Sequence, residues 1–296
     1  MTTIKNLAFK GGGVLGIAYA GAIQVLENQG VLKNIERVAG TSAGAITAAL
    51  VSLNYSAEEI TKIVNGTNFS DFEDHKDYLR VATKYGIYRG DALLAWIETQ
   101  IVNKGFAASA TFADFKNKGC RDLTVFASDI NTKGLKVFSF ATSPNVVVAE
   151  AVRASMSIPL FFEAYNFRNN NPDNHLYVDG GMIYNFPITF FDVNGTPNNE
   201  TMGLYLEDLG KAKPPVEVGY DHLIDYVKAV FETLMDAQVI NFEQDAEENK
   251  RTAVIDNLGI SAINFNLTKQ QQTDLYNSGV KFTTQYLKNR VSELVS

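Results

Sequence analysis

The chain has 296 residues, of which 46% are hydrophobic and 20% charged, a composition that excludes a disordered or fibrous protein. Its net charge of −7 opposes nucleic-acid binding and gives no general attraction to anionic lipid surfaces. A single cysteine, Cys120, and only three histidines exclude an internal disulfide and a structural zinc site.

The first third of the chain predicts strands that alternate with helices. Apolar runs at residues 4–9 and 35–39 predict strands, and helical patterns at residues 14–29 and 43–53 follow them, each after a glycine-rich turn. Because this alternation builds a parallel sheet with helices on its faces, we expect an α/β fold with a mostly parallel sheet between helices. Ligands of such sheets collect at the carboxyl ends of the strands, where both glycine turns fall.

The middle of the chain predicts further elements of the same kinds. A capping-box pattern that begins at Ser56 predicts another helix. Residues 123–127 and 135–140 predict two adjacent strands, because a turn sequence separates them. A helix is expected over residues 145–157 and a short strand over residues 176–178.

The last third carries weaker signals. Residues 223–235 place apolar side chains on one face of a helix, which favours core packing over membrane docking. Residues 243–251 are rich in charge, as expected of a solvated helix face or a loop. Since no repeat or boundary linker interrupts the chain, we expect one domain over residues 1–296, with the motifs in residues 4–190 and residues 200–296 packed on them.

The sequence also suggests where the protein works. The residues before the glycine run are too few for a secretory signal, and no later apolar stretch is long enough to span a bilayer. We therefore expect a soluble cytoplasmic protein, while transient contact with a membrane surface and non-classical export stay open.

The first glycine loop, Gly-Gly-Gly-Val-Leu-Gly at residues 11–16, matches G-x-G-x-x-G between a predicted strand and a predicted helix. Its backbone N–H groups can converge at a helix N-terminus and bind negative charge, either a ligand phosphate or the oxyanion of an acyl transfer. A dinucleotide site also needs an acidic residue at the end of the second strand, and Glu36 comes before that point. A P-loop is excluded because no Gly-Lys-Ser/Thr follows.

The second glycine turn, Gly-Thr-Ser-Ala-Gly at residues 40–44, matches G-x-S-x-G between a strand and an Ala-rich helix. In that context a serine lies on a tight turn with its hydroxyl available as a nucleophile, which is our interpretation of Ser42. The alternative is that Ser42 only caps the helix that follows.

A serine hydroxyl needs a base, and the chain offers two kinds. The histidines are His75, His175 and His222, and the chain order Ser42, Asp179, His222 is that of an α/β-hydrolase triad. However, none of the three histidines follows a strand in a glycine turn. Asp179, which precedes two glycines at a predicted strand end, is expected on the same edge as both glycine loops and favours a direct Ser–Asp dyad. The alternative is a carboxylate that only caps the Gly-Gly turn.

Four blocks in chain order resemble the patatin-like phospholipases: residues 9–16, 40–44, 154–162 and 179–181. Together they span about residues 4–190. The resemblance implies a three-layer α/β/α fold and a lipid acyl hydrolase of the phospholipase A or lysophospholipase type. It also implies a phospholipid or other lipid ester as substrate, peripheral contact with membranes, and no cofactor or metal.

The resemblance also assigns roles to individual residues. It makes Ser42 the nucleophile, Asp179 the proton acceptor, and the oxyanion donors the backbone amides of Gly11, Gly12 and Gly13. One departure is Leu15, which stands where many members of the family place a basic residue and which weakens the case for phosphate head-group binding at this loop. The acyl chemistry depends on backbone amides and is unaffected.

Three other functions remain as alternatives. An acyltransferase would use the same dyad and pass the acyl group to an alcohol other than water. A dinucleotide-binding protein would use the first glycine loop for a nicotinamide cofactor. A lipid-binding or storage protein would keep the fold without catalysis.

Overall fold

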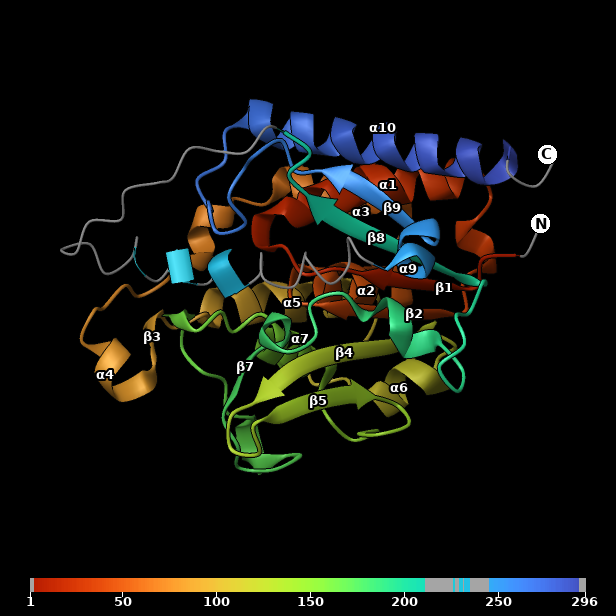
Figure 1. Ribbon diagram of the computed structural model, residues 1–296. Coiled ribbons are helices and arrows are strands. Elements are labelled where there is room, and N and C mark those ends of the chain that lie inside the picture. Colours follow the sequence, from red (N-terminus) through yellow and green to blue (C-terminus); the bar gives the residue numbers. More distant parts are fainter. Residues whose placement is uncertain (1–2, 211–225, 227–228, 231, 235–244, 293–296) are drawn as a thin grey trace.

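The computed structural model describes residues 3–210, 226, 229–230, 232–234 and 245–292. The strands of its central sheet are β1 (Asn6–Phe9), β2 (Arg37–Thr41), β4 (Asp122–Asp129), β5 (Gly134–Ser139), β7 (Tyr177–Asp179), β8 (Thr201–Glu207) and β9 (Thr252–Asp256). They are arranged in the order β5-β4-β2-β1-β8-β9, and β7 also pairs with β4 (Figure 1). The expected α/β class with a mostly parallel sheet is confirmed, since only β5 and β7 run antiparallel to their neighbour.

Helices connect these strands. The α-helices are α1 (Ile17–Asn28), α2 (Ala43–Ser52), α3 (Ala57–Gly66), α4 (Arg80–Lys84), α5 (Asp91–Asn103), α6 (Phe112–Asn117), α7 (Val148–Ser155), α9 (Ala246–Lys250) and α10 (Lys269–Ser292). The 3-10 turns are η1 (Gly13–Gly16), η2 (Leu32–Asn34), η3 (Phe69–Phe72), η4 (Arg168–Asn170), η5 (Gly180–Met182) and η6 (Pro187–Phe191). A separate parallel pair consists of β3 (Gly86–Tyr88) and β6 (Leu160–Phe162).

The elements predicted within residues 4–178 are present, with ends that differ by a few residues. The helix expected over residues 14–29 begins as the 3-10 turn η1 and continues as α1. The two strands predicted around residues 131–134 are β4 and β5, which pair antiparallel. The capping box is also confirmed, because Ser56 Oγ accepts the Glu59 N–H at 3.2 Å and Glu59 Oε2 accepts the Ser56 N–H at 2.7 Å.

The two faces of the sheet are covered differently. One face turns its alternate side chains into the main core, which includes Leu7, Phe9, Val38, Leu123 and Val125. The other face turns in smaller residues, Ala8 and Ala39, together with Phe126, and η6 covers them with Ile188 and Phe191. The chain that follows β7 therefore crosses the second face of the sheet.

Strand β4 has two partners along one edge, and this determines where β7 lies. β2 pairs with β4 in parallel up to Thr41 opposite Phe126. From Ala127 onward, β7 pairs with this edge of β4 in place of β2, and Ala127 faces Asp179. The opposite edge of β4 pairs with β5. Since β7 runs antiparallel, the end of β7 faces the end of β2.

Seven of residues 223–235, where an apolar helix face is expected, lie outside the described residues, as does His222. Val230 and Leu234 of that face are described and are 37% and 40% exposed, so the expected core packing is wrong for these two residues. The charge-rich stretch contains α9, none of whose residues is buried. In the part of the chain that the structure describes, no helix combines the length and the apolarity needed to cross a bilayer.

Helix α10 packs along α1, the helix that follows the first glycine loop (Figure 1). The contact depends on glycine, because a Cβ atom added at Gly279 would fall on the backbone carbonyl of Ala18, and one added at Gly21 would fall on that of Tyr276. The two backbones approach too closely at these points for any side chain.

We expect Gly279→Ala to lower the free energy of unfolding by about 1–3 kcal/mol, the usual cost of overpacking. Gly66→Ala is the matched control, because nothing lies within 4 Å of the added atom and alanine favours a helix. Urea unfolding of both variants measures the difference. Equal urea midpoints for Gly279→Ala and Gly66→Ala would contradict the claim that the contact between α1 and α10 requires glycine.

Candidate active site

Ser42 lies on a strained turn between β2 and α2. Its φ of 53° and ψ of −126° are outside the regions that serine favours, and conformations of this kind cost about 1–3 kcal/mol. A hydrogen-bonded chain stabilises the turn: the Ser42 N–H donates to Ser155 Oγ at 2.8 Å, and Ser155 Oγ donates to the Phe126 carbonyl at 2.5 Å. The tight turn predicted from G-x-S-x-G is therefore present, and β4 helps to fix it.

Ser42 Oγ donates a hydrogen bond of 2.7 Å to Asp179 Oδ2, across 137 residues of sequence. The contact follows from the pairing along β4, in which Phe126 faces the last residue of β2 and the next residue faces Asp179. We expected Asp179 at this edge of the sheet, but the antiparallel direction of β7 was not predicted. Met156 Sδ also approaches Ser42 Oγ, at 3.4 Å.

Asp179 is fully buried, and burial raises the pKa of its carboxyl group to about 7. Two hydrogen bonds oppose this rise, because Ser42 Oγ and the Gly181 N–H both donate to the carboxylate and stabilise its charged form. The Asp179 backbone is held as well, since its N–H donates to the Ser157 carbonyl at 2.8 Å and its carbonyl accepts from Ser128 Oγ at 2.9 Å. Such a carboxylate accepts a proton at a higher pH than an exposed one.

A buried cation, Arg153, braces the same region. Its guanidinium donates to Ser157 Oγ at 2.6 Å and to the carbonyls of Arg89 and Gly90 at 2.9 and 3.0 Å. Burial lowers the pKa of Arg153 to about 10, which leaves it charged near neutral pH. These contacts tie the end of α7, next to the Ser42 turn, to the segment that follows β3.

The first glycine loop lies against the Ser42 turn. A Cβ atom added at Gly11 would fall against Asn185 Oδ1 and lie 3.2 Å from Ser42 Cβ, so a side chain there would force its neighbours to move. The Gly11 N–H donates to the Asn185 carbonyl at 3.0 Å and is therefore occupied. The N–H groups of Gly12 and Gly13, in contrast, have no acceptor within the described residues. Of the three amides expected as oxyanion donors, that of Gly11 therefore already has a backbone acceptor.

Neither histidine of the described ranges forms a hydrogen bond with Ser42. His175 Nδ1 contacts Asp129 Oδ2 at 2.8 Å at the carboxyl end of β4, and its side chain is one-third exposed. His75 is exposed in the segment before β3 and makes no hydrogen bond with Ser42 or Asp179. The proposed triad with His222 concerns a residue outside the described ones.

The sequence argument missed several contributors to this site. Ser155 and Met156 belong to the block of residues 154–162, which we used only as a likeness, and their contacts with Ser42 required the fold. Asn185 gave no signal beyond its position six residues after Asp179. A dinucleotide site gains no support, because Glu36 precedes β2 and its side chain is exposed.

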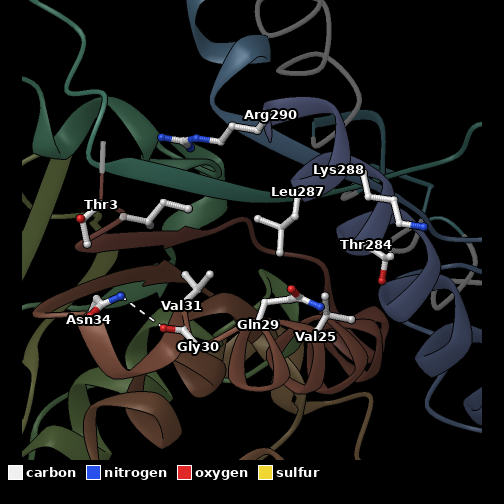
Figure 2. A pocket seen from close by; sticks show the side chains of 11 residues that line it. Thr3, Val25, Gln29, Gly30, Val31, Asn34, Thr284, Leu287, Lys288 and Arg290 are labelled. Carbon is white, nitrogen blue, oxygen red and sulfur yellow. Dashed lines mark hydrogen bonds between the residues drawn. The ribbon is translucent and has the colours of Figure 1, made fainter. Parts of the chain in front are cut away.

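A cavity of about 430 Å³ lies away from this site, between the end of α1 and the end of α10 (Figure 2). Its lining includes Ile4 and Asn34, which precede β1 and β2, so it lies at the amino ends of the strands. In Figure 2 the Leu287 side chain points from α10 toward Val25 of α1. Ser42 and Asp179 are not part of this cavity, which therefore does not serve them.

A family model, Patatin-like phospholipase, matches residues 7–192, a range that includes both glycine loops, Ser42 and Asp179. Two relatives are similar to the chain over different shares of its length. The uncharacterized protein YqhO of Bacillus subtilis (strain 168) is 31% identical over 296 residues, covering 95% of this chain and 97% of YqhO. A probable lipid hydrolase, 463L of Invertebrate iridescent virus 6, is 27% identical over 186 residues, covering 62% of each chain.

Among solved structures, VipD from Legionella pneumophila superposes with a TM-score of 0.65 at 19% sequence identity. The superposition covers 97% of this chain and 67% of VipD. At this identity the likeness supports the fold, and the fold places the two glycine turns at the carboxyl ends of β1 and β2.

The buried carboxyl group predicts how stability depends on pH. The pKa of Asp179 is about 7 in the folded chain against 3.8 ordinarily, so folding is opposed increasingly as pH rises from about 4 to 7. Relative to wild type, Asp179→Asn should gain up to about 1.4 kcal/mol of stability per pH unit over that range, and no more above it.

Urea unfolding at half-unit pH steps measures this difference. Asp122→Asn, which changes a half-exposed aspartate at the start of β4, is the control for removing a carboxyl group that is not buried. A difference between Asp179→Asn and wild type that stays constant from pH 4 to 8 would contradict a raised pKa.

Proposed function

The chain belongs to the patatin-like phospholipase family, and we propose that it hydrolyses lipid esters with Ser42 as nucleophile and Asp179 as general base. The observation that carries this proposal is the hydrogen bond of 2.7 Å between Ser42 Oγ and Asp179 Oδ2 on the strained turn. A nucleophile and a base within hydrogen-bond reach, with the base held by further contacts, form the arrangement that activates a serine.

The reaction begins when Ser42 Oγ attacks the ester carbonyl carbon and its proton passes to Asp179 Oδ2. The carbonyl oxygen becomes an oxyanion, which the N–H groups of Gly12 and Gly13 stabilise. Collapse of the intermediate breaks the bond to the alcohol, which leaves with the proton from Asp179. Water then attacks the acyl-enzyme and gives a proton to Asp179. As the bond between Ser42 Oγ and the acyl carbon breaks, Asp179 returns that proton to Ser42 Oγ, and the fatty acid is released.

The environment of Asp179 compensates for the weakness of a carboxylate as a base. An ordinary aspartate titrates near pH 3.9, and burial brings the pKa of Asp179 to about 7, near the pH at which the reaction would run. The remaining barrier must be lowered at the oxyanion, where one lost donor typically costs about 10²–10³ in rate. Leu15 is buried and supplies no charge for a phosphate group. We therefore infer that this loop binds the ester group of the substrate and not its phosphate head group.

Ser42→Ala and Asp179→Asn should each lower kcat/KM on a soluble short-chain ester by at least about 10³-fold, since each removes a group that acts in the chemical step. Release of free fatty acid, measured with and without an added alcohol, follows the reaction and separates hydrolysis from acyl transfer. Ser70→Ala, on a surface turn, is the matched control and should keep wild-type activity.

His222→Ala should also remain active in this assay, because the dyad needs no imidazole. Loss of activity in a folded His222→Ala variant would replace the dyad with a Ser-Asp-His triad. Full activity of Asp179→Asn would exclude Asp179 as the base.

The pKa of Asp179 predicts the pH profile of the same reaction. Because the base works only when ionised, kcat/KM should rise about tenfold per pH unit below about pH 7 and level off above it. His175→Ala is the control, since its imidazole contacts Asp129 and lies outside the proposed site. If the inflection near pH 7 disappears in His175→Ala, it belongs to His175 and not to Asp179.

A further inference from the structure

A short segment beside β3 exposes large apolar and aromatic side chains to solvent. Leu79 is 81% exposed, the largest value for a big hydrophobic side chain among the described residues, and Tyr78 and Tyr85 are 50% and 53% exposed. The three lie within eight consecutive residues, and α4 between them buries none of its own side chains. A concentration of this kind is unusual on the surface of a soluble protein and indicates an interaction site.

This segment is attached to the elements that surround Ser42. Its end leads into β3, which pairs with β6, and β6 begins four residues after Met156, the neighbour of Ser42 Oγ. An ion pair of 2.6 Å joins Arg80 of α4 to Glu163, which follows β6. In Figure 1, α4 projects at the left, the side toward which the arrowheads of β4 and β8 point. The segment therefore lies at the carboxyl edge of the sheet, as Ser42 and Asp179 do.

Other exposed apolar side chains occur at the same edge. Leu209 follows the carboxyl end of β8 and is 47% exposed, and Leu258 follows that of β9 and is 45% exposed. Both glycine loops follow strands that end at this edge, which is where ligands of such sheets collect, so we take it as the side from which a lipid ester approaches Ser42. The apolar surface thus lies where a lipid aggregate would meet the protein.

The composition of the segment fits a membrane interface. Tyrosine places an apolar ring and a polar hydroxyl at head-group level, and lysine can extend its ammonium group into water. The ammonium of Lys76 lies 5.2 Å from the ring centroid of Tyr78, and Lys84 is exposed at the other end of α4. With Arg80 paired to Glu163 and a net charge of −7 on the chain, electrostatic attraction to an anionic surface is small.

We propose that Tyr78, Leu79 and Tyr85 form a docking surface that inserts into the interface of a neutral phospholipid bilayer and brings the carboxyl edge of the sheet against it. The inference rests on the proposed lipid-ester function, because docking at this surface would bring the substrate in the bilayer close to Ser42. Apolar burial drives the contact, and the lysines tolerate it by keeping their charges in the head-group layer.

The test measures vesicle binding without hydrolysis. Ser42→Ala, used as the background, is floated with large unilamellar vesicles of pure phosphatidylcholine, and the bound fraction is measured. Adding Leu79→Ser should weaken binding about tenfold, since one leucine side chain is no longer transferred from water. Val193→Ser is the matched control: Val193 is 63% exposed but precedes the amino end of β8, on the opposite edge, and should not change binding.

Three results would overturn the proposal: absence of binding to phosphatidylcholine, equal losses for the two variants, or binding that requires phosphatidylserine. Failure of the proposed catalytic function can be told apart from failure of the docking surface, because the chain that keeps Ser42 is assayed separately on a soluble ester. On the soluble ester, Leu79→Ser in the chain that keeps Ser42 should have wild-type kcat/KM. On phosphatidylcholine vesicles, its rate of hydrolysis should fall about tenfold. If neither chain cleaves the soluble ester, the catalytic proposal fails and the binding result is still read on its own.

Discussion

The site depends on one feature of the sheet, the edge of β4 that two strands share. β2 ends opposite Phe126, and β7, arriving from the other direction, ends opposite Ala127. The residue after β2 is Ser42 and the last residue of β7 is Asp179, so neighbouring positions on one strand bring the hydroxyl and the carboxylate to 2.7 Å. Phe126 contributes again through its carbonyl, which accepts from the serine that holds the turn. A shift of one residue in either pairing would separate the two groups.

This arrangement stores energy at the point where chemistry is proposed. Ser42 has a positive φ, and Asp179 is buried with a pKa of about 7, stabilised in its charged form by one hydroxyl and one amide. Both features oppose folding and both favour reaction, since one presents the hydroxyl and the other strengthens the base. The surrounding core, including the close approach of α1 and α10 at Gly279, offsets their cost.

Local signals in the sequence predicted most of what is local in the structure. The glycine loops, the turn at Ser42 and the capping box at Ser56 each depend on residues within a few positions of one another, and the structure contains all three. Features that depend on distant segments were not predictable from these patterns. They include the antiparallel direction of β7, which places Asp179, and the Asn185 carbonyl, which occupies the Gly11 amide. The place of Asp179 before two glycines at a predicted strand end favoured it as the base, and the resemblance gave it the same role, but neither predicted the strand direction that brings it to Ser42.

The central claim is that Ser42 carries the acyl group during turnover. Treating the pure protein with an active-site phosphonate and mapping the adduct by peptide mass spectrometry tests this most directly, because the reagent reacts with an activated serine. The account predicts one adduct, on the peptide that contains Ser42, and much slower labelling when Asp179 is replaced by asparagine. A stable adduct on a different serine, or no adduct on a folded and ester-cleaving protein, would contradict it.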